Sequence, residues 1–323
     1  MAKIRVGVLR GGPSTEYDVS LKTGGSVLKY LSRDKYQARD ILLSRDGVWN
    51  IDGLPTHVHR LHHTVDVIFN ALHGTFGEDG GVQRLLDEVH VPYTGSGAYA
   101  SALAMNKALA KEHFSSAGLK VPRHIIVKDG DAEDRAAEKI FRTMAPPWVV
   151  KPLDNGSSVG VRVVRTILDL SIALRDSFAI SPTALVEEYI RGKEATCGVV
   201  EGYRGQEVYA LFPVEIVPPT DKSFFDYEAK YSGISRELCP GRFSEKEKEV
   251  LQNMAVAAHK TLGLSHYSRS DFMIHPTRGI FILETNNLPG LTEESLLPKS
   301  LAAVGAPYEH FLDHVVTLAL TQK

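Results

Sequence analysis

Four polar residues near the C-terminal end of the chain have the types and the spacing of a site for a metal ion and a phosphate. Asp271 lies in one apolar segment, and Glu284 and Asn286 lie in the next, with the turn sequence HPTRG between them. If these segments pair as a hairpin, Asp271 faces Glu284 and Asn286, which share one face of their strand. Carboxylate and amide oxygens are hard ligands that suit magnesium, and Arg269 on the same face indicates an anionic substrate such as a phosphate. The alternative is a surface hairpin with a solvated polar face, which explains this convergence less well.

A loop of small residues forms a second candidate site. The segment KPLDNGSSVGVRVV joins two predicted strands and contains Gly156, Ser157 and Ser158. Small residues allow backbone N–H groups to approach phosphate oxygens closely, and Lys151 at the end of the preceding strand would add a point charge. Taken alone, a short glycine-serine loop is more typical of a simple hairpin connection.

Charged residues at a predicted strand end and on one helix form a third group. Glu187 and Glu188 end the strand ALVEEYI, and Glu194 follows after a short turn. Such carboxylates can accept hydrogen bonds from an adenine amino group or from ribose hydroxyls. Taken alone, they indicate an exposed acidic edge that discourages aggregation, and Lys107 in MNKALAK indicates a solvated helix face.

Two residues follow predicted strands near the N-terminus, at the end of the sheet where α/β folds bind ligands. Glu16 could equally cap the helix that follows it, and a lone histidine such as His73 is more often structural than catalytic. Lys230 and Tyr231 lie in a long polar loop, 218–243. Taken alone, their side chains are expected in solvent, although a loop of this length is more often functional than idle.

The elements that must position these residues alternate between strands and helices in the first part of the chain. This alternation predicts a parallel sheet that binds ligands at its strand ends. The expected strands span 4–9, 65–72 and 91–93, and the expected helices span 19–31 and 82–89. We expect this N-terminal domain to cover residues 1–97.

Two further units follow, at 98–190 and at 191–323. In the second unit we expect helices at 98–117, 132–144 and 167–178, and strands at 123–127, 148–153, 159–164 and 184–190. In the third unit we expect strands at 195–201 and 207–217, the hairpin, and helices at 244–262, 296–304 and 308–320. Ser244 and Gly263 are the expected caps of the longest of these helices.

The composition is that of an ordinary soluble globular protein, with 43% hydrophobic and 24% charged residues. A net charge of -2 argues against nucleic-acid binding through a broad basic surface. The two cysteines, Cys197 and Cys239, fit a reducing cytoplasm. The first residues lack the apolar region of a signal peptide, and no apolar run reaches the length of a membrane helix. We therefore expect a cytoplasmic protein that contacts neither nucleic acid nor membrane.

The order of the motifs resembles that of one known family along nearly the whole chain. The D-alanine–D-alanine ligases, which belong to the ATP-grasp superfamily, have segments similar to GGPSTEYDVSLKTG, HGTFGEDG, YTGSG, KPLDNGSSVGV, FFDYEAKY, SRSDF and ETNNLPGLTEESLLP. The first segment and the EAKY loop are the most specific to this family. The resemblance implies an α/β and α+β fold, in which an N-terminal doubly wound parallel-sheet domain precedes a two-lobe ATP-grasp fold.

The resemblance also implies that the chain binds ATP as a substrate, with two Mg²⁺ or Mn²⁺ ions. The residues implied at the phosphates are Lys107, Lys151, Gly156, Ser157, Ser158 and Lys230. The residues implied at the adenine and the ribose are Glu187, the backbone of Glu188 and Ile190, and Glu194. The residues implied at the metal ions are Asp271, Glu284 and Asn286.

Two further groups of residues are implied around the first D-alanine. Glu16 would hold its ammonium group, and His73 would line its subsite. Glu16, Ser157 and Tyr231 would form a hydrogen-bonded set that joins a lid to the N-terminal domain.

The remaining implied residues serve the transferred groups and the second substrate. Lys230 and Arg269 would lie at the transferred phosphoryl group, and Arg269 with the N–H of Gly290 would stabilise an oxyanion. Ser295 and the N–H of Leu296 would bind the carboxylate of the second D-alanine.

The activity implied is ATP-dependent ligation of two D-alanines through a D-alanyl phosphate, which gives ADP and phosphate and supplies a peptidoglycan precursor. A homodimer is expected because the family commonly forms dimers. The alternatives are a ligase that joins D-alanine to D-lactate or D-serine, another ATP-grasp ligase, and a nucleotide-binding regulator without catalysis. Tyr231 in EAKY favours the dipeptide type. The chain departs from the family pattern at Asn106, at NNL (286–288) and at LLPK (296–299), and none of these changes removes a catalytic residue.

Overall fold

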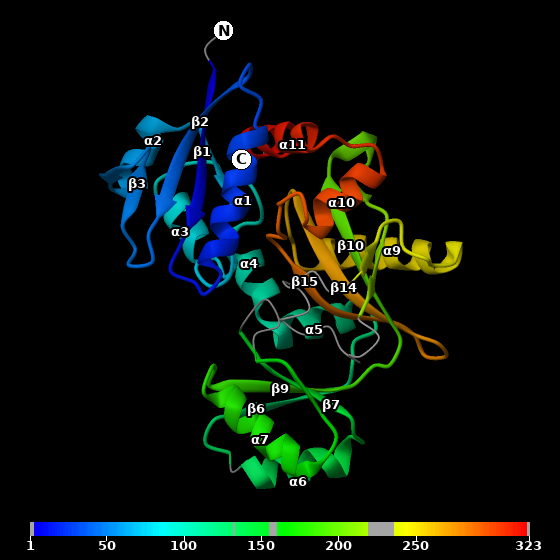
Figure 1. Ribbon diagram of the computed structural model, residues 1–323. Coiled ribbons are helices and arrows are strands. Elements are labelled where there is room, and N and C mark those ends of the chain that lie inside the picture. The colour runs from blue at the N-terminus through cyan, green and yellow to red at the C-terminus, as the bar shows by residue number, and fades with distance from the viewer. Residues whose placement is uncertain (1–2, 132, 155–159, 219–235, 322–323) are drawn as a thin grey trace.

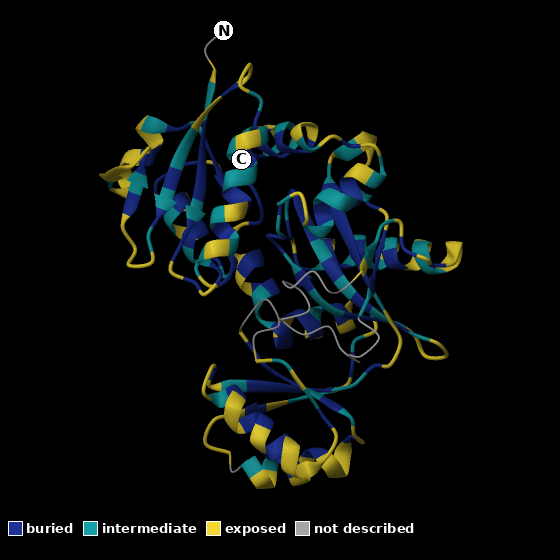
Figure 2. Ribbon diagram, in the orientation of Figure 1, coloured by how far each residue is buried: buried dark blue, intermediate teal, exposed yellow. Residues whose placement is uncertain are grey.

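The computed structural model describes residues 3–131, 133–154, 160–218 and 236–321. They form three α/β units that meet at the middle of the molecule (Figure 1). Buried residues lie along the sheets and the inner faces of the helices, and exposed residues lie on the outer faces (Figure 2).

The N-terminal unit is a five-stranded sheet with helices on both faces. Its elements are β1 (Ile4–Gly11), α1 (Tyr17–Tyr30), β2 (Tyr36–Leu43), β3 (Trp49–Ile51), β4 (Leu54–Thr56), η1 (Val58–Arg60), α2 (Leu61–Thr64), β5 (Val67–Asn70) and α3 (Gly81–Glu88). The strand order is β4-β3-β2-β1-β5. Strands β2, β1 and β5 run parallel, whereas β3 and β4 extend one edge antiparallel.

Strand β1, which lies between β2 and β5, explains why this unit needs two helical layers. Val6 and Val8 pack on one face of the sheet with Phe311 of the C-terminal helix. Leu9 packs on the opposite face with Val82 of α3. A strand that is buried on both faces reads as a continuous apolar run, which is the pattern that predicted it.

The central unit is an antiparallel four-stranded sheet covered by two helices. Its elements are β6 (His124–Lys128), α6 (Glu133–Thr143), β7 (Trp148–Pro152), β8 (Arg162–Val164), α7 (Ile167–Phe178) and β9 (Thr183–Glu188). The two helices that precede it, α4 (Ala98–Met105) and α5 (Lys107–Ser116), pack mainly in the core of the C-terminal sheet. The strand order is β6-β9-β7-β8, so β9 lies inside the sheet and not at its edge.

The C-terminal unit is built on a third, antiparallel sheet of order β13-β12-β10-β14-β15, with β11 paired to β10. Its elements are β10 (Lys193–Glu201), η2 (Tyr203–Gly205), β11 (Val208–Ala210), β12 (Val214–Val217), β13 (Arg236–Leu238), α9 (Glu245–Thr261), β14 (Tyr267–His275), β15 (Gly279–Asn286), α10 (Leu296–Ala303) and α11 (Tyr308–Thr321). The N-cap predicted at Ser244 is confirmed, and Ser244 and Glu247 bond reciprocally at the start of α9. The C-cap is Leu262, and Gly263, which was expected there, follows it. Helix α11 returns to pack beside α1 (Figure 1).

Several predicted elements differ from the structure. The helix predicted at 98–117 is two helices, because the backbone of Asn106 is extended and its side chain accepts a hydrogen bond from the N–H of Leu109. The strand predicted at 207–217 is interrupted before Pro213, which has no N–H to donate to a ladder. The strand predicted at 91–93 is a single bridge between Tyr93 and Ile68. Strands β2, β3 and β4 were not predicted.

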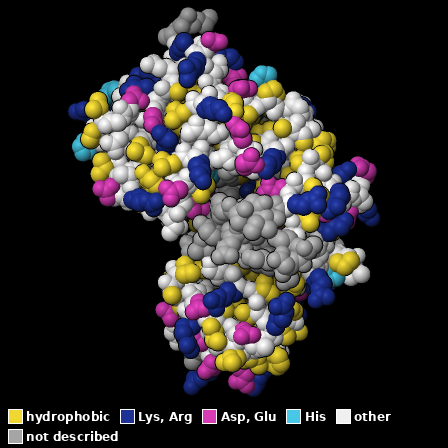
Figure 3. Space-filling model, viewed as in Figure 1, with side chains coloured by type: hydrophobic (Ala, Val, Ile, Leu, Met, Phe, Trp, Pro, Cys, Tyr) yellow, Lys and Arg dark blue, Asp and Glu magenta, His cyan; other side chains and the backbone are white. Residues whose placement is uncertain are grey.

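The surface carries both signs of charge. Lysine and arginine side chains are interspersed with aspartate and glutamate over the face shown in Figure 3, in keeping with a net charge of -2. Within the described ranges, no helix combines the length and the apolar character needed to cross a membrane.

Candidate active site

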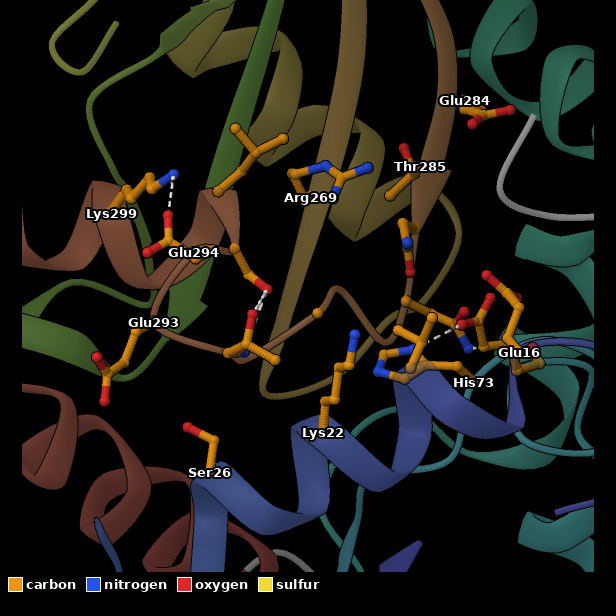
Figure 4. Close-up of a pocket in the computed structure, with 18 of the residues that line it drawn as sticks. Glu16, Lys22, Ser26, His73, Arg269, Glu284, Thr285, Glu293, Glu294 and Lys299 are labelled. Carbon is orange, nitrogen blue, oxygen red and sulfur yellow. Dashed lines mark hydrogen bonds and ion pairs between the residues drawn. The ribbon is translucent and has the colours of Figure 1, made fainter. Parts of the chain in front are cut away.

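A pocket of about 1020 Å³ lies where the three units meet. The N-terminal unit contributes Glu16, Lys22 and His73 to its wall, and the C-terminal unit contributes Arg269 and Glu284 on the opposite side (Figure 4). Residues that are distant in the sequence therefore face one space, as expected for the site of a ligand that bridges domains.

The predicted hairpin is present, but only one of the two residues expected opposite Asp271 is its direct partner. Asp271 of β14 pairs with Glu284 of β15, and Arg269 pairs with Asn286. The register shifts between Asp271 and Phe272, so a bulge follows directly after the aspartate. Bulges often occur beside active sites, where they redirect a side chain. Glu284 and Asn286 line the pocket.

Asp271 is held by two partners. The guanidinium of Arg269 donates from Nε to Oδ1 at 2.9 Å and from Nη2 to Oδ2 at 3.0 Å. The hydroxyl of Thr196 donates to Oδ1 at 2.7 Å from the neighbouring strand β10. Thr196 was not predicted, because its role depends on the pairing of β10 with β14.

Three charged side chains form a buried cluster beside the pocket. Glu187 lies 2.7 Å from Nζ of Lys111 through Oε1 and 2.9 Å from Nζ of Lys151 through Oε2. Burial acts to raise the pKa of Glu187, but the two ammonium groups outweigh it and lower this pKa to about 2. Burial lowers the pKa of Lys111 to about 8, although Glu187 opposes the shift. Glu187 therefore does not form the exposed acidic edge expected of it alone, because β9 is an internal strand.

Lys107 is likewise not on a solvated face. It is the first residue of α5, lines the pocket and is 8% exposed. Burial lowers the pKa of its ammonium, and the nearby Glu284 opposes that shift. Lys111 lies one helical turn after Lys107, and this spacing of four residues was the signal in MNKALAK that could have identified it.

The residues expected at adenine and ribose lie along β9 and the start of β10. The Glu188 carboxylate pairs with Arg278 at 2.8 Å, and its backbone N–H donates to the carbonyl of Arg123 at 2.9 Å. That N–H is therefore already engaged. Ile190 is buried, and Glu194 is half-buried within β10.

Glu16 and His73 lie together on the N-terminal wall of the pocket (Figure 4). Glu16 is the N-cap residue of α1, as the capping alternative expected, although its side chain makes no capping hydrogen bond to that helix within the described residues. His73 has a partner on each ring nitrogen, with Thr23 at 2.8 Å from Nε2 and Glu78 at 3.2 Å from Nδ1. These partners, which were not predicted, fix the orientation of the ring.

The loop that precedes α10 holds the residues expected at the second substrate. The Ser295 hydroxyl lies 2.8 Å from the hydroxyl of Thr292 and accepts from its N–H at 3.1 Å. A Cβ on Gly290 would lie 2.9 Å from Oγ of Ser295, so the loop fits best with glycine there. Leu296 is the first residue of α10, where N–H groups lack intrahelical acceptors and favour an anion.

The remaining predicted site residues lie outside the described part of the chain. These residues are Gly156, Ser157, Ser158, Lys230 and Tyr231.

Comparison with known proteins identifies the family. Residues 53–96 match the family described as D-ala D-ala ligase N-terminus, and residues 113–317 match the one described as D-ala D-ala ligase C-terminus. The D-alanine--D-alanine ligase of Geobacter sulfurreducens is 40% identical over 317 residues, which cover 98% of this chain and 94% of that protein.

Solved structures agree with these matches. The VanG D-Ala:D-Ser ligase from Enterococcus faecalis has a TM-score of 0.87 and 29% identity, and the match covers 98% of this chain and 100% of that chain. The D-alanyl-alanine synthetase A from Vibrio cholerae has a TM-score of 0.87 and 26% identity over 100% of both chains. The resemblance that the motifs indicated is therefore confirmed, and the chain belongs to the D-alanine–D-alanine ligase family, whose ATP-grasp fold it shares.

Proposed function

We propose that this chain joins two D-alanine molecules into D-alanyl-D-alanine and converts ATP into ADP and phosphate in doing so. The observation that carries the proposal is the composition of one pocket. A carboxylate, Glu16, faces it from one domain, while Arg269, Glu284 and Asn286 face it from another. The ammonium group of an amino acid would pair with Glu16 on the first side of the pocket. Its carboxylate would then meet a phosphate of ATP on the second side.

The first D-alanine would be oriented by the N-terminal wall. The Glu16 carboxylate would pair with its ammonium group, and His73, fixed by Thr23 and Glu78, would pack beside it. This arrangement directs the carboxylate of the substrate towards Arg269 and the hairpin. Holding the two reactants in this way converts a bimolecular encounter into a unimolecular step.

The donor set of the hairpin fits a hard divalent cation. Within the described ranges, no group of three or more His, Cys, Asp or Glu side chains is placed to hold a metal. The set proposed here instead combines two carboxylates with one amide, Asp271, Glu284 and Asn286, which suits Mg²⁺ or Mn²⁺. When bound there with ATP, the ions would neutralise phosphate charge during transfer.

In the first step, a carboxylate oxygen of D-alanine attacks the γ-phosphorus of ATP, and ADP leaves. The product is D-alanyl phosphate. Two anions must approach each other, and the buried cations Lys107 and Lys151, together with the half-buried Arg269, would offset their repulsion.

In the second step, the neutral amine of the second D-alanine attacks the acyl carbon, and phosphate leaves. Ser295 and the N–H of Leu296 would hold the carboxylate of this substrate. Arg269 and the N–H of Gly290 would stabilise the oxyanion of the tetrahedral intermediate through hydrogen bonds.

We extend the proposal to the organisation of the protein. The domains would cover 1–97, 98–190 and 191–323, and the last would include the loop 218–243. The protein would act in the cytoplasm, in line with its two free cysteines. It would form a homodimer, as the family commonly does. Size-exclusion chromatography with light scattering tests the dimer.

The decisive assay measures ADP release with and without D-alanine. We expect release to depend on D-alanine and to give one dipeptide for each ADP. The variant Glu16→Gln keeps the shape of the side chain and removes the charge opposite the ammonium, so we expect it to raise the KM for D-alanine. ADP release that is indifferent to D-alanine would refute the proposal.

A further inference from the structure

Lys111 is a buried cation to which none of the proposed steps gives a role. Its side chain is 1% exposed, on the face of α5 that points into the protein. Transfer of an ammonium group from water into a protein interior is costly unless the group is paired. A buried lysine is therefore retained either for its own charge and hydrogen bonds or because a buried carboxylate would lack a counter-ion without it.

The charge around Lys111 is not balanced within the cluster. Lys111 and Lys151 share the single carboxylate of Glu187, and Lys107 and Glu284 lie close enough to influence the pKa of Lys111 or of its neighbours. The three-residue cluster thus carries a net charge of +1. A surplus of buried positive charge next to the pocket suits an anion, such as a nucleotide phosphate.

The ammonium of Lys111 also connects two lobes. Nζ donates to the backbone carbonyl of Leu283 at 2.9 Å, and the next residue in β15 is Glu284. The same Nζ lies 2.7 Å from Glu187 in β9 of the central sheet. One group on α5 therefore contacts both the strand that carries a proposed metal ligand and the carboxylate that holds Lys151.

We propose that Lys111 is a positioning residue that does not touch substrate. Through Glu187 it holds Lys151 at the nucleotide phosphates, and through the Leu283 carbonyl it holds the segment of β15 that carries Glu284. This inference rests on the proposed roles of Lys151 and Glu284. If the cluster served stability alone, an apolar side chain of similar length would replace Lys111 without a specific effect on nucleotide binding.

Two substitutions separate the two contacts. Lys111→Gln keeps an N–H donor for the Leu283 carbonyl but removes the charge beside Glu187. Lys111→Met removes both contacts. We expect both variants to weaken binding of a non-hydrolysable ATP analogue by about tenfold, the lower end of the loss that partners behind a ligand residue cause in metal sites. We expect only Lys111→Met to raise the magnesium concentration that half-saturates the protein in the presence of that analogue.

Arg278 offers a matched control at the same junction. It ties the turn of the same hairpin to Glu188 of β9, but its side chain is 40% exposed and lies outside the cluster. Arg278→Gln therefore loosens the contact between the two lobes without changing the charge at Lys151. We expect its affinity for the analogue to stay within about twofold of wild type, since exposed ion pairs contribute little.

Calorimetry measures both affinities directly, so the test of Lys111 does not depend on turnover. Thermal unfolding of each variant identifies any loss of folded protein, and Lys111→Gln, which leaves a donor in place, covers the case in which Lys111→Met fails to fold. Wild-type nucleotide affinity in Lys111→Gln would overturn the proposal. An equal loss in Arg278→Gln would also overturn it, because the effect would then be general loosening. Failure of the ligase function appears separately, as ADP release without dependence on D-alanine.

Discussion

Replacement of Thr196 by valine tests whether the hairpin is a metal site. Thr196 is 2% exposed, and its hydroxyl donates to Oδ1 of Asp271 at 2.7 Å. Valine has nearly the same shape and lacks the donor. The substitution therefore removes one of the two groups that orient Asp271, without opening a cavity and without touching the pocket itself.

The size of the effect follows from the bonds that remain. A hydrogen bond to a charged group contributes about 1.5–3 kcal/mol. Arg269 still contacts both oxygens of Asp271 at 2.9 and 3.0 Å, so the carboxylate stays in place but moves more freely. We therefore expect the lower end of that range to appear as lost metal affinity, which corresponds to roughly tenfold.

The assay is the free-magnesium concentration that gives half-maximal, D-alanine-dependent ADP release at saturating ATP. We expect this concentration to rise about tenfold in Thr196→Val and to return towards the wild-type value in Thr196→Ser, which restores the hydroxyl. An unchanged magnesium requirement in Thr196→Val would refute the assignment of Asp271 as a metal ligand.

Three other perturbations test the metal ligand, the buried lysine and the acceptor. Glu284→Gln keeps the volume of the side chain and removes a negative charge. Turnover at limiting magnesium should therefore fall by more than the roughly 100-fold loss caused by replacing a residue that only holds a metal ligand in place. Wild-type turnover at limiting magnesium would contradict the assignment of Glu284 as a ligand. Burial lowers the pKa of Lys111 to about 8, so nucleotide affinity should weaken above that pH in the wild type but not in Lys111→Arg. Unfolding is not the cause of this loss, because the pKa of Lys111 is lower in the folded state than in the unfolded state. The contribution of Lys111 to stability therefore rises over the same pH range. When D-alanine and D-lactate compete as acceptors at neutral pH, mass spectrometry should find mainly D-alanyl-D-alanine, and a majority of depsipeptide would overturn the acceptor assignment.

The sequence predicted best what depends on neighbouring residues. The hairpin could be predicted because its alternating apolar residues and its turn lie within one short segment, and the strand period places Glu284 and Asn286 on one face. The cap of α9 has the same local character, since Ser244 and Glu247 are three residues apart.

Features that depend on tertiary contacts were missed. Glu187 was expected at an exposed edge, but the sheet order places β9 between β6 and β7, and strand order is not a local property. Lys111 and Thr196 acquire their roles from partners far along the chain, at Leu283 and Asp271. The break at Asn106 depends on whether its side chain caps a new helix or continues the old one, and helical propensity alone favours continuation.

The reaction through D-alanyl phosphate is tested most directly by following one oxygen atom. If a carboxylate oxygen of D-alanine attacks the γ-phosphorus and the amine of the second D-alanine later displaces phosphate, that oxygen leaves with the phosphate. D-Alanine labelled with ¹⁸O in its carboxylate should therefore give phosphate that carries one ¹⁸O atom for each dipeptide formed. Dipeptide formation with unlabelled phosphate would contradict the account.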